Sequence, residues 1–206
     1  MARGRSERGA TVGSVEHGNS AVLVSVGPDG QVLDRRRVDL THDLPTHPYH
    51  HEGSWAVGRY RDSPWAKDIS LPEAVALVER VREAADRGAC TALEELAAEM
   101  PVPIVRIAIR VCPELPPTIE ARIEDNRAQT MADTVMYRRA LAGAAETRGW
   151  PVFWYDREHV FREAATVLGR KDVEAHLQAL GRSLGAPWRA EHKLATAAAI
   201  AAARVR

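Results

Sequence analysis

A β-hairpin near the start of the chain constrains the fold more than any other feature. Residues 20–26 (SAVLVSV) are rich in β-branched side chains, and the turn sequence Gly-Pro-Asp-Gly follows at once over 27–30. In such a turn Pro presets one backbone dihedral, Asp bonds back to the backbone and Gly tolerates a positive φ. Residues 31–40 then return as a second strand, and a short β-branched stretch at 11–15 precedes the pair. We therefore expect three strands joined by tight turns.

Farther along the chain, strands alternate with helices. Residues 104–111 (IVRIAIRV) alternate and have a strongly apolar second face, and residues 151–155 (PVFWY) form a compact strand. Helical spacing, capping boxes and terminal Gly or Pro residues predict helices over 71–88, 91–100, 118–145, 158–168, 172–184 and from 187 onward. This order predicts an α/β fold with a mixed five-stranded sheet, in which three antiparallel strands precede two strands that alternate with helices.

The composition restricts the partners and the compartment. The 206 residues carry 28 Lys plus Arg against 28 Asp plus Glu, so no global field draws the chain to nucleic acid or to an anionic membrane. The longest apolar stretch near the end, 197–203, is too short to span a bilayer. We expect a soluble cytoplasmic protein with no membrane contact. It would have a basic tail over 1–10 and one domain over 11–206, with an inserted loop and helix segment at about 43–100.

Four stretches carry a resemblance to a known family. Residues 15–18 (VEHG) are similar to an Asp-Pro-Gly motif at the end of an opening strand, and 139–149 (RALAGAAETRG) to a small-residue helix that closes on Gly. Residues 150–160 (WPVFWYDREHV) are similar to a Pro-Val strand that leads into a helix, and 186–203 (APWRAEHKLATAAAIAAA) to an Ala-rich final helix. Together they resemble the RuvC-type Holliday-junction resolvases of the ribonuclease H-like superfamily.

The resemblance implies a homodimeric nuclease that hydrolyses phosphodiester bonds in DNA or structured nucleic acid. Such enzymes use two Mg²⁺ or Mn²⁺ ions, about 4 Å apart, held by carboxylates from the first strand, the fourth strand and the last helix. The residues that the resemblance implies for catalysis are Glu16, Glu114, Glu120, Glu191 and His192, and those for metal binding are Glu16, Glu114 and Glu191.

The middle acid of this set stays open between two residues. Glu120 matches the Ile-Glu pair of the family when residues are counted back from the end of the long helix. Glu114 lies nearest the tip of the strand, and the Pro pair at 116–117 makes a strand through Glu120 unfavourable because Pro offers no ladder donor. This argument slightly favours Glu114.

Two departures from the family pattern favour an alternative function. Glu16 stands where the family has Asp, which moves the carboxylate outward by about one C–C bond, roughly 1.5 Å. A misplacement of about 1 Å can cost about 100-fold in rate. On the last helix, the single acid Glu191 gives fewer anionic ligands than a two-metal site usually holds. The alternative is a catalytically degenerate domain of the same fold that serves as a binding or assembly subunit.

Basic and aromatic side chains provide candidate nucleic-acid contacts. The basic candidates are Arg35, Arg37, Arg138 and Arg139, together with the terminal Arg204 and Arg206. Because strand side chains alternate, Arg35 and Arg37 share one face and Arg36 takes the other, which also fits a solvated face. The aromatic candidates Trp55, Tyr60 and Trp65 lie among basic residues, so they could stack on bases or anchor the loop that carries them.

The same loop is rich in histidine. Histidines at this spacing could bind zinc or another metal, although no paired Cys supports this. The residues concerned are His42, His47, His50, His51 and Glu52.

Overall fold

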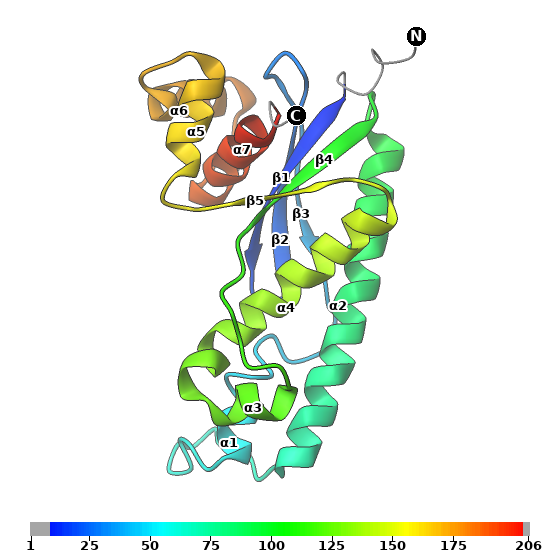
Figure 1. The fold of residues 1–206 in the computed structure, drawn as a ribbon, viewed down its shortest axis with the longest axis vertical. Helices are drawn as coiled ribbons and strands as arrows, with labels where there is room; N and C mark the ends of the chain where they lie inside the picture. The colour runs from blue at the N-terminus through cyan, green and yellow to red at the C-terminus, as the bar shows by residue number, and fades with distance from the viewer. Residues whose placement is uncertain (1–8, 204–206) are drawn as a thin grey trace.

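A five-stranded mixed sheet lies at the centre of the molecule, whose computed structural model describes residues 9–203 (Figure 1). The strands are β1 (Ala10–His17), β2 (Ser20–Val26), β3 (Val32–Asp39), β4 (Ile104–Arg110) and β5 (Val152–Tyr155). Their spatial order is β3-β2-β1-β4-β5. The pairs β1–β2 and β2–β3 are antiparallel, whereas β1–β4 and β4–β5 are parallel. The predicted α/β class, with three antiparallel strands followed by two that alternate with helices, is confirmed.

Helices cover both faces of this sheet. They are α1 (Glu52–Ala56), α2 (Leu71–Glu99), α3 (Ile119–Glu124), α4 (Asn126–Thr147), α5 (Val160–Leu168), α6 (Val173–Leu184) and α7 (Ala190–Ala202). Helices α2 and α4 pack on one face and α5, α6 and α7 on the other, while α1 and α3 lie beyond the ends of the strands (Figure 1). Within residues 9–203, no helix is long and apolar enough to cross a membrane.

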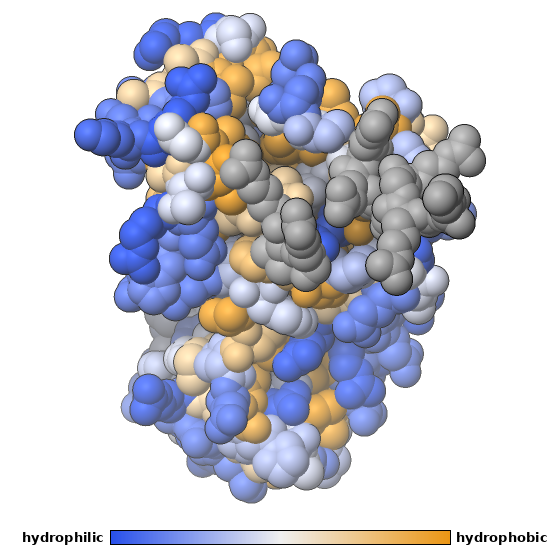
Figure 2. Space-filling view, turned by 45° about the horizontal axis from the view of Figure 1, so that its top comes forward, coloured by the Kyte–Doolittle hydropathy of each residue, from blue (hydrophilic) through white to orange (hydrophobic). Residues whose placement is uncertain are grey.

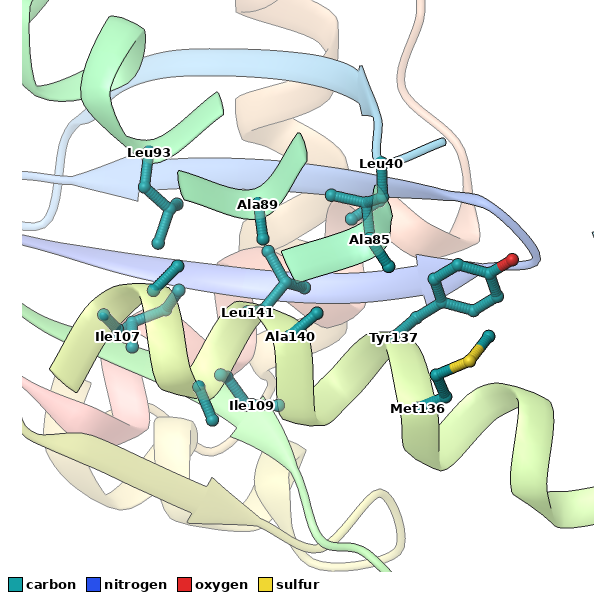
Figure 3. Close-up of a cluster of buried hydrophobic side chains, with 14 of the residues drawn as sticks. Leu40, Ala85, Ala89, Leu93, Ile107, Ile109, Met136, Tyr137, Ala140 and Leu141 are labelled. Atoms are coloured by element: carbon teal, nitrogen blue, oxygen red, sulfur yellow. The ribbon is translucent and has the colours of Figure 1, made fainter. Parts of the chain in front are cut away.

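The hydrophobic core has one part on each face of the sheet. Leu93 of α2, Leu141 of α4 and Ile107 of β4 are fully buried together between the sheet and its two long helices (Figure 3). On the other face α7 lies directly on β1, because a Cβ on Gly13 would come within 1.8 Å of the carbonyl oxygen of Ala195. Small residues on the strand and on the Ala-rich helix therefore set how closely α7 approaches the sheet.

Helix α2 is one continuous helix where the sequence predicted two. It begins with the expected capping box between Ser70 and Glu73. It then continues through Gly88, where we expected it to end, because this Gly allows a close approach rather than a turn. A Cβ on Gly88 would lie 2.1 Å from the carbonyl oxygen of Leu40, which directly follows β3.

The helix predicted over 118–145 is interrupted near its start. Asp125 ends α3, and its carboxylate accepts hydrogen bonds from the backbone N–H groups of Arg127 and Ala128 at 2.8 and 3.0 Å. This satisfies two of the free backbone donors at the start of α4 and makes Asp125 its N-cap. The capping interaction of Asp125 therefore divides the predicted helix into α3 and α4.

Buried polar side chains of α4 hold the segment between β3 and α2. Asp133 is buried, and its two oxygens accept hydrogen bonds from the backbone N–H groups of Tyr49 and His50, each at 3.0 Å. Gln129 is also buried, and its side-chain oxygen accepts a hydrogen bond from the Ser54 hydroxyl at 2.8 Å. The loop at the start of the predicted insertion is thus fixed to α4.

The surface exposes few large apolar side chains. Figure 2 shows one face, on which polar residues cover the flanks and apolar residues lie between them along the middle. Among residues 9–203, the large hydrophobic residues that are exposed are Leu33, Tyr60, Trp65 and Val111.

Ala10, which falls in the range 1–10 of the predicted basic tail, belongs to β1. Residues 1–8 and 204–206 lie outside the described residues. The predicted phosphate contacts Arg204 and Arg206 fall in that part of the chain.

Candidate functional site

Glu16 lies near the carboxyl end of β1, where it forms an ion pair with Arg138 of α4. One oxygen of Glu16 accepts hydrogen bonds from Nε and Nη2 of Arg138 at 2.8 and 2.5 Å. Both side chains are deeply buried, with 5% of Glu16 and 6% of Arg138 exposed. The Nη1 group of Arg138 also donates to the carbonyl oxygen of Val111 at 2.8 Å, just after β4. The guanidinium therefore joins the ends of β1 and β4.

Further polar contacts connect the parallel strands beside this ion pair. The Ser14 hydroxyl donates to the carbonyl oxygen of Ala108, and the Tyr155 hydroxyl donates to the carbonyl oxygen of Ser14, each at 3.0 Å. Burial raises the pKa of Tyr155 and that of the nearby Cys112 thiol. Both groups are therefore neutral at pH 7, and Cys112 has little thiolate character for nucleophilic attack.

The sheet separates Glu16 from the acidic end of the last helix. Successive side chains of a strand point to opposite faces, so residues three apart in β1 lie on opposite sides. Gly13 faces Ala195 of α7, whereas Glu16 reaches Arg138 of α4 on the other side. The structure therefore does not bring Glu16 together with Glu191, which lies on α7 (Figure 1).

His192 has a structural partner within α7. It is buried, and its Nδ1 accepts a hydrogen bond from the backbone N–H of Arg189 at 3.2 Å, which caps the start of the helix. Burial is the largest cause that lowers the pKa of His192, and the charge of Arg35 lowers it further. This histidine is neutral at pH 7 and occupied in helix capping.

The two candidates for the middle acid lie outside the ion pair, on exposed parts of the chain after β4. Glu114 is exposed in the loop after β4, and Glu120 is exposed in the first turn of α3. The chain runs from β4 away from the sheet before it reaches α3 (Figure 1). Neither acid has a hydrogen bond or ion pair within residues 9–203, so the choice between them stays open.

The arrangement of these residues does not fit a two-metal centre. Among residues 9–203, no three His, Cys, Asp or Glu side chains are grouped so that they could hold a metal ion. The expected metal ligands are separated as follows: Glu16 is paired with Arg138, Glu114 lies in an exposed loop, and Glu191 belongs to the opposite face.

The His-rich loop packs its rings against one another. The ring centroids of His47 and His50 lie 5.6 and 5.4 Å from that of His51, which stacks on Trp55 at 6.2 Å. Burial and then the neighbouring imidazoles lower the pKa values of His47 and His50. These rings and Trp55 pack the loop on itself, and they are part of no metal-binding group in the described chain.

The four predicted phosphate contacts that lie within residues 9–203 divide into two pairs. Arg138 is buried in the ion pair, and Arg35 donates to the carbonyl oxygens of residues 184–187 at 2.8 to 3.2 Å. The guanidinium groups of Arg138 and Arg35 are therefore already hydrogen-bonded within the chain. Arg37 is exposed and lies 3.9 Å from an Asp39 oxygen. Arg139 is exposed and lies over the Trp154 ring of β5 at 5.3 Å.

Two further arginines lie at the ends of the parallel strands, although we did not expect them to be functional. Arg110 ends β4 and Arg157 follows β5, and both charges act on Tyr155, whose pKa they lower against the larger effect of burial. With Arg139 they form a set that we name the guanidinium rim. None of the three has an ion pair among the described residues. Arg110 and Arg157 lie at or just beyond the ends of apolar strands, and this position could have indicated them in the sequence.

Comparisons with known proteins bear on the fold. No protein-family model and no curated protein matches the chain. A solved structure of RuvC from Thermus thermophilus in complex with a Holliday junction substrate matches with a TM-score of 0.50 and 13% identity, covering 94% of this chain and 92% of that chain. A second RuvC structure from Thermus thermophilus has a TM-score of 0.45 and 12% identity, with coverages of 93% and 91%. The chain therefore has a ribonuclease H-like fold, similar to that of RuvC.

Proposed function

We propose that this chain is a RuvC-like domain that binds branched or structured DNA without cutting it by metal-dependent hydrolysis. The observation that carries the proposal is the buried ion pair between Glu16 and Arg138. The resemblance puts an acidic metal ligand at this strand end, and here a guanidinium already neutralises that acid.

The electrostatics of the ion pair oppose a metal ion at this position. Removing either charge of a buried pair leaves the other uncompensated, so Arg138 is expected to stay bound to Glu16. A divalent cation that approached Glu16 would also meet the positive charge of Arg138 at short range, in a poorly solvated environment that weakly screens their repulsion. The chain's own residues therefore favour binding over cleavage.

The guanidinium rim supports binding to a phosphate backbone. Arg110 and Arg157 act on Tyr155, and Arg139 lies over the ring of the neighbouring Trp154, so the three come from both faces of the sheet near the carboxyl ends of β4 and β5. Arginine matches phosphate geometry with two parallel hydrogen bonds. The related fold in the RuvC complex holds a Holliday junction. We extend this substrate class to the present chain as part of the proposal.

Two aromatic residues of the loop after α1 are available to unpaired bases. Tyr60 and Trp65 are 55% and 66% exposed. Trp55, in contrast, stacks on His51 and has Lys67 over its ring at 5.9 Å. Of the two interpretations from sequence, anchoring applies to Trp55, and base stacking is the one that we propose for Tyr60 and Trp65.

Fluorescence anisotropy with a four-way DNA junction, a duplex and a single strand tests the proposal. We expect tightest binding to the junction. Arg110→Gln and Arg139→Gln should each reduce the slope of log affinity against log salt by about 0.9, the value for one lost phosphate contact. The matched control is Arg87→Gln, an exposed arginine on α2, which should leave the slope unchanged.

The same samples, incubated with Mg²⁺ or Mn²⁺, test the absence of cleavage. Junction cutting that disappears in Glu16→Gln would overturn the proposal in favour of the metal-dependent nuclease. If the chain binds none of the three substrates at low salt, both the proposed DNA-binding function and the metal-dependent nuclease are wrong. Dimerisation and a cytoplasmic location stay predictions, and sedimentation of the purified chain would measure the former.

A further inference from the structure

The turn that carries Tyr60 is hydrogen-bonded on both sides, although it lies at the surface. Before it, the backbone N–H of Arg59 donates to the carbonyl oxygen of Ser54 at 2.8 Å. After it, the backbone N–H of Ser63 donates to the carbonyl oxygen of Tyr60 at 3.0 Å. The backbone at Tyr60 is therefore fixed, while 55% of the residue is exposed.

Tyr60 has a left-handed backbone conformation. Its φ is 57°, in the region that Gly enters freely and that a bulky residue enters only at a cost in free energy. Because more than half of Tyr60 is exposed, packing on the domain recovers little of this cost. Strained backbone of this kind is typical of positions that contact a ligand. The conformation therefore indicates a role for the ring outside the fold itself.

The side chain of Arg59 fixes the turn to α3. Its Nη1 group donates to the carbonyl oxygen of Ile123 at 2.9 Å, and its Nη2 group donates to that of Glu124 at 2.5 Å. Both carbonyls belong to the last turn of α3, where carbonyl groups lack partners within the helix. The guanidinium of Arg59 therefore caps α3 and holds the neighbouring Tyr60 beside it.

Gln129 of α4 joins the same contacts from the interior. It is 1% exposed, and its side-chain oxygen accepts hydrogen bonds from Nη1 of Arg59 at 3.0 Å and from the Ser54 hydroxyl at 2.8 Å. Its side-chain nitrogen donates to the carbonyl oxygen of Ile123 at 3.2 Å. Because a buried amide is costly to leave unpaired, Gln129 holds Arg59 and Ser54 in one arrangement. We name Arg59 and Gln129 the loop anchor.

We propose that the loop anchor presets Tyr60 to stack on one unpaired base of a structured DNA. In this inference, which rests on the DNA binding proposed above, Arg59 and Gln129 are positioning residues and touch no base themselves. Stacking on a ring whose backbone is already fixed costs the protein little conformational freedom. A fully paired duplex offers no free base face, so Tyr60 should contribute only where a base is unpaired.

Fluorescence anisotropy with a matched duplex, and with the same duplex carrying one unpaired base, tests this role of Tyr60. We expect the parent chain to bind the bulged duplex about fivefold or more tightly than the matched one, the lower end of the range for one stacked base. Tyr60→Asn removes the ring and tolerates the left-handed backbone, so this preference should disappear. Tyr60→Phe retains a ring that can stack and should keep the preference.

Arg59→Gln tests the positioning. It retains the Tyr60 ring but removes the contacts with α3, so the preference should fall to that of Tyr60→Asn, and the double variant should lose nothing further. The matched control is Arg127→Gln, which removes an exposed positive charge nearby, since the charges of Arg59 and Arg127 both act on Asp125. This control should keep the preference. A uniform loss of folded protein weakens binding to both duplexes alike, so destabilisation alone leaves the ratio of affinities unchanged.

The outcomes separate this inference from the proposed function. If the parent binds both duplexes equally, or if Tyr60→Asn or Arg59→Gln keeps the preference, the inference is wrong and DNA binding at the guanidinium rim still stands. An equal loss of preference in Arg127→Gln would assign the effect to charge and would also contradict the positioning role. If the chain binds neither duplex nor the four-way junction at low salt, the proposed function itself has failed.

Discussion

The ion pair between Glu16 and Arg138 predicts a large and specific stability effect. Arg138→Met leaves the carboxylate of Glu16 buried without its partner, which typically costs about 3–5 kcal/mol. The exposed fractions of 5% and 6% put this pair in the buried class rather than among surface pairs, which contribute about 0–1 kcal/mol. Domains of ordinary stability unfold with about 5–15 kcal/mol, so the single variant should lose a substantial part of the total.

Urea unfolding followed by circular dichroism measures this effect. With a slope of about 2 kcal/mol per molar urea, Arg138→Met should lower the midpoint by roughly 1.5–2.5 M. Replacing both partners, in Glu16→Leu combined with Arg138→Met, removes the unpaired charge and should recover most of the loss or exceed the parent. Arg139→Met, the exposed neighbour, should shift the midpoint by less than about 0.3 M.

A small shift for Arg138→Met would refute this reasoning. If the midpoint falls by less than about 0.5 M, the two charges are well solvated. Glu16 would then be free to bind a cation. The same conclusion would follow if the double variant lost as much stability as the sum of the two single variants, because the two residues would not be coupled.

Two further predictions concern the interior. Gly88→Ala places a Cβ 2.1 Å from the Leu40 carbonyl oxygen, and we expect it to lower the thermal midpoint by overpacking worth about 1–3 kcal/mol, although Ala is the better helix former; an unchanged or higher midpoint would contradict the close approach. Burial raises the pKa of Asp133 from 3.8 to about 7. The native state then holds a proton that the unfolded state releases between these values, so this group's contribution to stability falls as pH rises from about 4 to 7, by roughly 4 kcal/mol in all. Melting curves should show this decline in the parent and not in Asp133→Asn; equal pH profiles would contradict it.

Local patterns in the sequence predicted the elements whose signals are themselves local. The hairpin, the capping box at Ser70 and the alternating strand at 104–111 each depend on residues that are close in sequence, and each is present in the fold. Gly88 misled the interpretation because its role depends on Leu40, which directly follows β3 and is distant in the sequence. A glycine that ends a helix and one that admits a neighbouring backbone look alike in sequence.

The candidate site was harder to predict for the same reason. The sequence pointed to Glu16 at the end of the first strand, and the structure places it there. Its partner Arg138 is 122 residues away, so nothing local to either residue indicates the ion pair. The alternation of side chains along β1 was available from the sequence, but which face α7 would cover was not. The separation of Glu16 from Glu191 therefore required the three-dimensional fold.

Helix α4 connects two parts of the molecule mechanically. Asp133 holds the backbone at Tyr49 and His50, and Arg138, little more than one turn farther along the same helix, joins the ends of β1 and β4. Because a helix moves as a rigid body, these two contacts move together. A partner that displaces the loop after β3 would therefore also displace α4, and α4 would pass the displacement to the ends of β1 and β4.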